Sequence, residues 1–374
     1  MKFVVSCNLL LSHLQTVGRV IASKNAQPIL DCFLFEVSNN RLQITAADSE
    51  TRMVTAIDIS DVTGSGAFAI PSKTLLEALK ELPEQPVRFE IDESTLSLLI
   101  FYENGKYNFV AQKGDEYPLS KPLADDAAKL SIDASDLLSG ITHTLFATGE
   151  DDLRPIMNGV LFDISPKNIT FVGSDGHKLA RLKNLSAVDN AEAAFILPKK
   201  PANLLKTILP RETGKVNIAF DANNAYITME KFTVVCRLIE GKYPQYNAVI
   251  PKDNPYRVTV DRLNFLNALK RVSTFSSEGS NLIKLAISTN SIFITAQDID
   301  YSTSAEETIA CVYEGEAMSV GFKGAFLIET LNNILSEEVV VALADPSRAG
   351  LVLPVENEEN EDLLMLLMPM MLND

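Results

Sequence analysis

The 374-residue sequence has few of the residues on which metal and catalytic sites depend. It contains no Trp, only three His, and four scattered cysteines with no C-x-x-C pair (Cys7, Cys32, Cys236 and Cys311). Zinc sites need clustered Cys and His ligands, so we expect no metal site and four buried, reduced thiols. No Ser or Cys stands in an arrangement with a base that suggests catalysis. We therefore expect neither catalytic residues nor a cofactor.

Long apolar stretches are also missing. The longest run, Leu363 to Leu372, is too short to cross a bilayer. The first residues lack the basic and then apolar layout of a signal peptide. The sequence therefore predicts a cytoplasmic protein that has no membrane partner.

Positive charge is scarce overall but concentrated in places. The chain has 49 acidic and 33 basic residues and a net charge of −16, which argues against a surface coated by DNA. Four tracts nevertheless contain Lys or Arg and no Asp or Glu: Phe3 to Leu30, Ala193 to Arg211, Arg262 to Ser277, and Met318 to Ile328. If they share one face, that face attracts phosphates without reading base sequence. The other interpretation is ordinary solvated helix faces.

One pattern of segments occurs three times along the chain. Residues 28–37 match residues 155–164 at an offset of 127 (155 minus 28), and residues 42–48 match 169–175 at the same offset. Residues 292–298 repeat the second segment 123 positions later (298 minus 175). The same signals in the same order at a nearly constant period indicate three copies of one domain.

Each copy shows helix, strands, helix and strands, with meandering strands rather than alternating β and α elements. The expected helices are one capped by Ser6 or Asn8 and ending near Ile21, and then Thr74–Leu82, Ala134–Phe146, Pro201–Leu209, Asp261–Phe275 and Ala325–Leu335. The sequence predicts an α+β fold of antiparallel sheets in three domains. We expect their boundaries at 1–125, 126–252 and 253–374.

Two segments are the best candidates for a site. The segment Ser174-Asp175-Gly176-His177 has the residue types of a turn between two strands. Asp can accept hydrogen bonds from its own backbone, and Gly allows a positive φ. His177 is then either a turn residue that bonds neighbouring backbone or part of a pocket. The run Leu363 to Leu372 contains four Met, a flexible side chain suited to several partners. From Met368 onward it is equally a buried strand end or a partner surface.

Three α+β repeats, the signature from Ser174 to Leu179, the Tyr243-Pro244 turn and the terminal Met368-Pro369-Met370 together resemble the β sliding clamp of bacterial DNA polymerase III. The resemblance covers essentially the whole chain. It implies a non-enzymatic processivity factor whose head-to-tail homodimer closes as a ring around duplex DNA. Helices would line the hole and sheets would lie outside, and the DNA would be held whatever its sequence.

The resemblance also implies a cleft between the second and third domains, where polymerases, the clamp loader and repair proteins dock short peptides. Carried over by position, its residues are Met157, Ser174, Gly176, His177, Lys178, Leu179, Pro244, Val249, Leu366, Met368, Pro369 and Met370. Met371 departs from the basic residue that some members have near the terminus.

The DNA contacts implied by position, together with the basic tract of the second domain, are Lys24, Lys73, Arg154, Lys199 and Lys200. Lys24 and Lys73 stand where the family often has Arg. Lys keeps the positive charge but lacks the planar, two-pronged set of donors of a guanidinium group. Some members have polar or aromatic DNA-contacting residues where this chain has Asp151, Pro155 and Ile156.

The resemblance places the subunit interface at Tyr107 and Phe109 on an edge strand, which would meet Thr274 and Phe275 at a helix end of the partner. Edge strands present unpaired N–H and C=O groups, and head-to-tail contacts with the right rotation close into rings. The alternative function is a repeat-built protein scaffold that does not bind nucleic acid, and an enzyme comes third.

Overall fold

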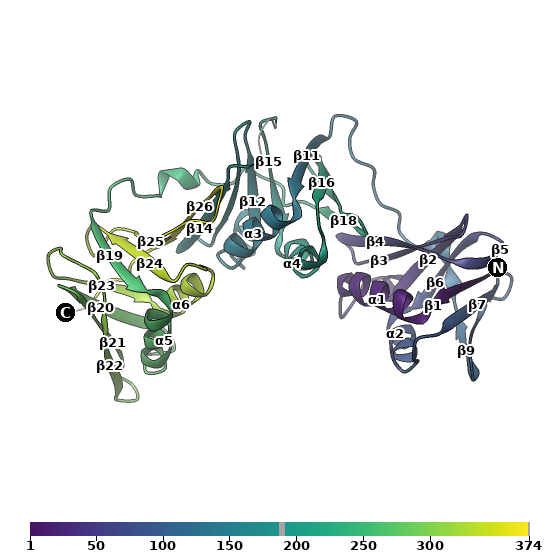
Figure 1. The fold of residues 1–374 in the computed structure, drawn as a ribbon, viewed down its shortest axis with the longest axis horizontal. Coiled ribbons are helices and arrows are strands. Elements are labelled where there is room, and N and C mark those ends of the chain that lie inside the picture. The colour runs from purple at the N-terminus through teal and green to yellow at the C-terminus, as the bar shows by residue number, and fades with distance from the viewer. Residues whose placement is uncertain (187–190, 373–374) are drawn as a thin grey trace. The chain divides into compact units, whose positions relative to one another are not determined.

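The computed structural model describes residues 1–186 and 191–372, and it contains the same order of elements three times, with one additional strand, β5, in the first repeat (Figure 1). The first repeat consists of β1 (Lys2–Ser6), α1 (Cys7–Val17), β2 (Cys32–Ser38), β3 (Arg41–Ala47), β4 (Thr51–Asp58), β5 (Ser60–Thr63), β6 (Gly66–Pro71), α2 (Ser72–Lys80), β7 (Pro86–Asp92), β8 (Ser97–Tyr102) and β9 (Gly105–Val110). A two-residue strand, β10 (Gln112–Lys113), follows it.

The second repeat consists of β11 (Ala128–Asp133), α3 (Ala134–Leu145), β12 (Gly159–Ile164), β13 (Ile169–Ser174), β14 (Lys178–Asn184), β15 (Ala193–Pro198), α4 (Lys199–Ile208), β16 (Lys215–Phe220), β17 (Asn224–Thr228) and β18 (Phe232–Arg237). The third consists of β19 (Tyr256–Asp261), α5 (Arg262–Ser273), β20 (Leu282–Ser288), β21 (Ser291–Asp298), β22 (Thr303–Ala310), β23 (Met318–Lys323), α6 (Gly324–Asn332), β24 (Glu338–Leu343), β25 (Gly350–Pro354) and β26 (Glu361–Leu367).

The α+β repeats of antiparallel strands agree with the sequence, but each repeat begins with a strand that we did not predict. β1, β11 and β19 come directly before the first helix of their repeats. In β1, Phe3 and Val5 are buried while Lys2 is exposed, and the strand pairs with β7. The strand ends where Ser6 caps α1 by accepting a hydrogen bond from the backbone N–H of Leu9. A five-residue strand running straight into a helix gives too short a pattern to separate from that helix.

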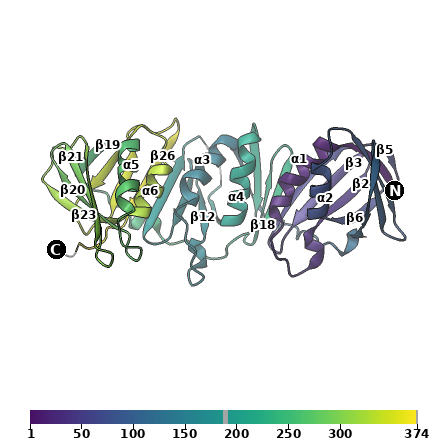
Figure 2. The ribbon, with the colours of Figure 1, turned by 90° about the horizontal axis from the view of Figure 1, so that it is seen from below.

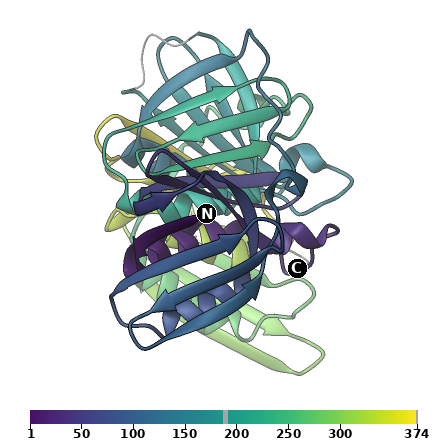
Figure 3. The same ribbon diagram turned by 90° about the vertical axis from the view of Figure 1, so that its right-hand side faces the viewer.

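The described strands form four sheets, in which paired strands are antiparallel throughout the registers that the structure shows. A five-stranded sheet has the order β5-β1-β7-β8-β9, and a four-stranded sheet has the order β22-β21-β20-β23. Figure 3 shows the five-stranded sheet near the N-terminus, in purple and blue. The two larger sheets have the orders β10-β6-β2-β3-β4-β18-β17-β16-β11 and β15-β12-β13-β14-β26-β25-β24-β19.

Each larger sheet joins strands from two neighbouring repeats. β4 pairs with β18 of the second repeat, and β14 pairs with β26 of the third. The chain accordingly divides into two compact units: residues 1–135 with 203–238 (unit 1), and residues 136–202 with 239–374 (unit 2). The middle repeat contributes strands to both units.

Paired helices lie against the sheets within the units. α1 and α2 run side by side in unit 1, and α5 and α6 do so in unit 2 (Figure 2). Leu10, Leu14 and Val17 form the buried face of α1, and Leu75 and Leu79 that of α2. The apolar residues at helical spacing thus account for most of the buried positions, as expected for amphipathic helices, and the polar residues His13 of α1 and Ser72 of α2 are buried beside them.

The four cysteines are all buried and free, as predicted. Burial raises the pKa of Cys32 to about 11 and that of Cys236 to about 12, so these thiols stay protonated. Across residues 1–186 and 191–372, no helix combines the length and the apolar character that crossing a membrane would need.

Candidate functional site

The turn between β13 and β14 is held by hydrogen bonds from its own residues. Asp175 Oδ1 accepts from the backbone N–H groups of His177 and Lys178, both at 2.8 Å. Ser174 Oγ donates to the Lys178 carbonyl at 2.9 Å and accepts from Gly176 N at 3.2 Å. Gly176 has φ +90°, a conformation that other residues rarely adopt. The predicted turn chemistry is therefore present, and it leaves the side chain of His177 exposed.

Strand pairing brings the end of the chain beside this turn. Lys178 and Leu179 of β14 pair with Leu367 and Leu366 of β26. One residue later, Met368 N donates to the His177 carbonyl at 2.9 Å. The signature turn and the C-terminal segment, almost two hundred residues apart in sequence, thus form the two sides of one site.

A cavity of about 220 Å³ opens between them. Its lining includes every predicted cleft residue except Pro369 and Met370, and it adds Tyr243, Gln245 and Tyr246. The lining residues are Met157, Ser174, Gly176, His177, Lys178, Leu179, Tyr243, Pro244, Gln245, Tyr246, Val249, Leu366 and Met368. All of them belong to unit 2, so the structure assembles this site within one compact body.

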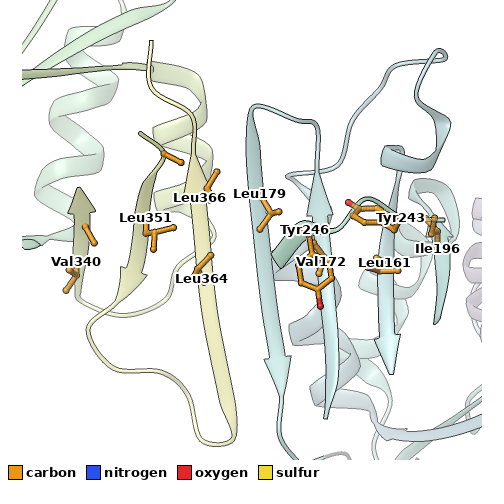
Figure 4. Packing of buried hydrophobic residues seen from close by; sticks show 12 residues of the cluster. Leu161, Val172, Leu179, Ile196, Tyr243, Tyr246, Val340, Leu351, Leu364 and Leu366 are labelled. Carbon is orange, nitrogen blue, oxygen red and sulfur yellow. The ribbon is translucent and has the colours of Figure 1, made fainter. Parts of the chain in front are cut away.

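The floor of the cavity belongs to a buried apolar cluster. Leu179 and Leu366 line the cavity, and they belong to one cluster with Val172, Leu351 and Leu364 on the same or neighbouring strands of the sheet (Figure 4). Leu179 is 4% exposed and Leu366 is 3% exposed. Because core side chains of this kind interdigitate and resist displacement, the apolar floor is preformed.

One wall carries two buried tyrosines, Tyr243 and Tyr246, that were not among the predicted cleft residues. The Tyr246 hydroxyl donates to Asp163 Oδ2 at 2.7 Å, and Tyr243 is 8% exposed. Burial, and next the hydrogen bond to Asp163, raise the pKa of Tyr246 to about 12. Burial likewise raises the pKa of Tyr243. Both rings are therefore neutral wall elements that fix the segment before Val249.

Lys178 is a buried cation at the edge of the cavity, 7% exposed. Its Nζ lies 3.2 Å from Asp175 and 2.9 Å from Glu329 of α6, and 4.2 Å from the ring centroid of Phe326. A buried ammonium needs such partners to offset lost hydration. Lys178 thus ties the signature turn to α6 of the third repeat.

The tail beyond Met368 is docked at the edge of another sheet. Met370 N donates to the Gly321 carbonyl of β23 at 2.8 Å. A Cβ on Gly321 would lie 2.8 Å from Met370 O and 2.8 Å from Leu372 Cδ2. Only glycine therefore lets the tail approach this closely, and the docked tail leaves Met368 beside the cavity with 44% of its surface exposed.

The predicted DNA-contacting residues differ in how available they are. Lys24 and Lys73 are exposed in unit 1. In unit 2, Arg154 Nε donates to Asp151 at 2.9 Å, and Lys199 Nζ lies 2.9 Å from Glu150. Each hydrogen bond is the largest cause of the lowered pKa of its carboxylate partner. The fifth residue, Lys200, is half-buried.

The predicted interface residues lie at an edge strand and a helix end. β9, with Tyr107 and Phe109, pairs only with β8 in its sheet and is thus an edge among the described strands. Phe109 is 9% exposed and Tyr107 is half-buried, so both mainly face their own domain. Thr274 and Phe275 follow α5, and both are exposed.

Sequence reasoning missed Tyr243, Gln245 and Tyr246 as lining residues. The Tyr243-Pro244 turn was the available signal, because it repeats Tyr117-Pro118 of the first domain. No local pattern could have indicated Phe326 or Glu329 behind Lys178. Among residues 1–186 and 191–372, no three His, Cys, Asp or Glu side chains gather as a possible ligand set for a metal ion.

Comparison with known proteins agrees with this architecture. Models of the N-terminal, central and C-terminal domains of the DNA polymerase III beta subunit match residues 1–121, 131–245 and 247–371. The beta sliding clamp of Pseudomonas aeruginosa is 27% identical over 373 residues, and that of Pseudomonas putida is 26% identical over 374, with both chains covered in full in each case.

Among solved structures, the DNA polymerase III subunit beta of Pseudomonas aeruginosa superposes with a TM-score of 0.94 at 26% identity, again over the full length of both chains. The repeated domains, their order and the near-complete coverage leave one conclusion: this chain belongs to the DNA polymerase III beta subunit family.

Proposed function

We propose that this chain, a DNA sliding clamp by family, works as a head-to-tail homodimer that closes into a ring around duplex DNA. Its three clamp domains would be residues 1–125, 126–252 and 253–374. The clamp would act in the cytoplasm, without catalysis, cofactor or metal of its own. Its mechanism is topological: the ring is linked to the duplex, and dissociation requires opening.

Weak, sequence-independent phosphate contacts suit such a mechanism. Lys24 and Lys73 are exposed cations on a chain whose net charge is −16. These two lysines attract the phosphate backbone of DNA, while the acidic residues elsewhere on the protein repel it. Arg154 and Lys199 already hold carboxylates, so each must exchange a partner before it contacts a phosphate. Contacts of this kind permit sliding because no single one is strong.

The edge strand β9 supports the dimer. Its unpaired side presents N–H and C=O groups that a strand of a second copy can satisfy. Phe275, exposed at the end of α5, offers an apolar contact for the opposite end of such an interface. Using different surfaces on the two ends is what allows a head-to-tail assembly to close.

The preformed cavity supports the proposal that partner proteins dock short peptides on this chain. An apolar floor of Leu179 and Leu366, with a methionine at the rim, suits one or two apolar side chains of an extended peptide. We propose that the polymerase, the clamp loader and repair proteins each insert a short segment there. The remaining predicted residues, Pro369 and Met370, act by holding Met368 in place.

Retention on nicked circular DNA tests the topological mechanism. The protein is loaded with its cognate loader and ATP, and retention is measured before and after the circle is linearised. We expect retention on the circle and loss after cutting. Equal retention on both forms would indicate ordinary binding and refute the ring, and retention on neither would favour a protein scaffold that does not hold DNA.

A further inference from the structure

A second cavity, of about 170 Å³, lies within unit 1 and is lined mainly by polar and cationic side chains. It is bounded by α1, by the end of α4 with the following 3-10 turn (Leu209–Arg211), and by the start of β18. Its lining residues are Ser12, His13, Thr16, Arg19, Thr207, Ile208, Arg211, Glu212, Lys231 and Phe232. None of them belongs to the partner cleft.

Three cations converge on this cavity without carboxylate partners. Arg19, Arg211 and Lys231 are exposed, and within residues 1–186 and 191–372 none of them forms an ion pair. The one acidic lining residue, Glu212, accepts a hydrogen bond from Glu230 N at 3.2 Å. Like charges gathered at a concave surface repel one another, and the attraction of each cation to a bound anion would offset that repulsion.

His13 gives the cavity a buried polar group with a defined tautomer. Its Nδ1 lies 2.7 Å from Thr55 Oγ1, and the Thr55 hydroxyl donates to the Lys231 carbonyl at 2.8 Å. That hydroxyl has a single proton, so Nδ1 must donate to Thr55. Neutral His13 therefore carries its proton on Nδ1 and has a lone pair on Nε2. The side chain is 9% exposed and lines the cavity.

The surroundings keep this imidazole neutral when the cavity is empty. Burial, and next the charge of Lys231, lower the pKa of His13 below its ordinary value. The ring of Phe232 lies 5.3 Å away and is uncharged, as is Thr55 of β4. The other charged groups around the cavity are Arg19 on the 3-10 turn after α1 (Gly18–Val20), Arg211 on the turn after α4, Glu212, and Glu230 on the segment before Lys231.

We propose that this cavity binds a phosphate group. The two guanidinium groups of Arg19 and Arg211 match phosphate oxygens in pairs, and Lys231 adds a compact charge. The space of about 170 Å³ admits one such group with its first waters. In this proposal His13, which lines the cavity and bonds Thr55 through Nδ1, turns Nε2 toward the phosphate, and Nε2 changes from acceptor to donor when the ring is protonated.

That reversal distinguishes two sources of phosphate. Orthophosphate retains a P–OH proton near neutral pH and can donate it to neutral Nε2. A phosphodiester of nucleic acid has no such proton, so it gains the contact only when His13 is protonated. Diester binding should therefore strengthen as the pH falls through the lowered pKa of His13, whereas orthophosphate binding should change less.

Calorimetric titration with orthophosphate at constant ionic strength, on the full-length protein, is the first test. We expect Arg211→Gln and Lys231→Gln each to weaken binding about tenfold, the usual size for a lost charge-assisted hydrogen bond. Lys129→Gln removes one exposed charge of the same unit outside the cavity and should leave binding unchanged. Equal losses in all three variants would refute a defined site.

Titration with a short DNA duplex at pH 5.5 and pH 8 is the second arm. His13→Asn keeps a donor toward Thr55 and removes Nε2, so it should abolish the pH dependence specific to the cavity. If Arg211→Gln and Lys231→Gln weaken DNA binding more than Lys129→Gln does, the phosphate group that the cavity binds is a phosphodiester of nucleic acid. If neither probe distinguishes the cavity variants from Lys129→Gln, the site does not exist. Because orthophosphate binding needs no ring, that result would leave the clamp mechanism untouched.

Discussion

In each compact unit, two strands from neighbouring repeats pair at a junction, β4 with β18 in unit 1 and β14 with β26 in unit 2. Both junctions end in the same pattern of backbone hydrogen bonds. Thr51 of β4 pairs with Cys236 of β18, and Lys178 of β14 pairs with Leu367 of β26. Beyond each pair, a backbone N–H donates at 2.9 Å to a turn carbonyl: Arg237 to Glu50 in unit 1, and Met368 to His177 in unit 2. Glu50 and His177 are equivalent at the repeat offset of 127 (177 minus 50).

The turns themselves are also equivalent. Asp48 Oδ1 accepts from Glu50 N at 2.8 Å and from Thr51 N at 2.6 Å, as Asp175 Oδ1 does from His177 and Lys178. Asp298 repeats the arrangement in the third domain with Asp300 and Tyr301, at 3.0 and 3.2 Å. A carboxylate that caps its own turn is therefore a property of the repeat rather than of the partner cleft.

Side chains on this common backbone make the difference. Arg52 occupies the position of Leu179 (179 minus 52 is 127), and its guanidinium carbon lies 5.7 Å from the ring centroid of the buried Tyr117. At the second junction, Leu179 with Leu366 leaves an apolar floor under open space. Strand pairing therefore builds a similar junction in both units, and apolar residues at a few positions give the second junction an open apolar cavity.

Removing the tail should break the second junction most completely. Deleting residues 368–374 removes Met368 and its docked support while β26 stays whole. We expect at least ~100-fold weaker binding of a partner peptide, because an apolar anchor and its fixed position are lost together. Fluorescence anisotropy with a labelled peptide measures the affinity, and size-exclusion chromatography should show an unchanged dimer.

A shorter deletion, of residues 371–374, is the matched control because it keeps Met368 and the Met370 hydrogen bond to Gly321. It should bind peptide nearly as the parent chain does. Full affinity in the longer deletion would show that the cavity is not where partners dock.

Leu179→Arg should give the second junction the character of the first. The aliphatic stem of Arg can cover the apolar floor while its guanidinium enters the cavity, as Arg52 does over Tyr117. We expect peptide affinity to fall about 30-fold through lost apolar contact and filled space. The reciprocal Arg52→Leu should leave peptide affinity unchanged, and thermal unfolding of both variants would separate lost binding from lost folding.

Local patterns in the sequence were enough to predict most of the elements and their order, whereas the cleft residues that line the cavity were predicted through the resemblance to the clamp family. Helical spacing in α1 and alternation in β12 and β13 are short-range signals, and the Asp175 turn is fixed by its own residues. β1, β11 and β19 were missed because each is a short strand that runs directly into a helix.

Contacts between distant segments could not be predicted in this way. Nothing in the local pattern of β14 indicates that its partner is β26, since register depends on the assembled fold. For the same reason, the sequence did not reveal that Glu329 and Phe326 surround Lys178, or that Glu150 holds Lys199. The roles of the site residues in binding DNA, peptides and a second subunit stay predictions.

Gly321→Ala should move the tail without adding an atom to the lining of the cavity. The added Cβ would lie 2.8 Å from Met370 O, and a backbone atom cannot move without displacing the segment. We expect peptide affinity to fall about tenfold as Met368 loses its fixed position. Combined with the deletion of residues 368–374, the substitution should cause no further loss, as a double-mutant cycle would measure.

Val320→Ala, at the buried neighbouring position, is the control for general weakening of β23. It should lower the melting temperature and leave peptide affinity close to that of the parent chain. If the Gly321→Ala and Val320→Ala variants lose affinity in proportion to their lost stability, the tail contact has no separate role.

Glu329→Gln should have the smallest effect and tests the contact that is special to the second junction. Thr51, the equivalent of Lys178 at the first junction, is uncharged, whereas Lys178 is buried between Asp175, Glu329 and the Phe326 ring. Glu329 is 46% exposed, so solvent screens its charge and the pair should contribute less than about 1 kcal/mol to the free energy of unfolding. We expect peptide affinity to fall roughly two- to threefold, because Asp175 and Phe326 still hold the ammonium group of Lys178. Glu329→Gln keeps the shape of the side chain, so a loss as large as that from Gly321→Ala would mean that the charge of α6, rather than the docked tail, positions this side of the cleft.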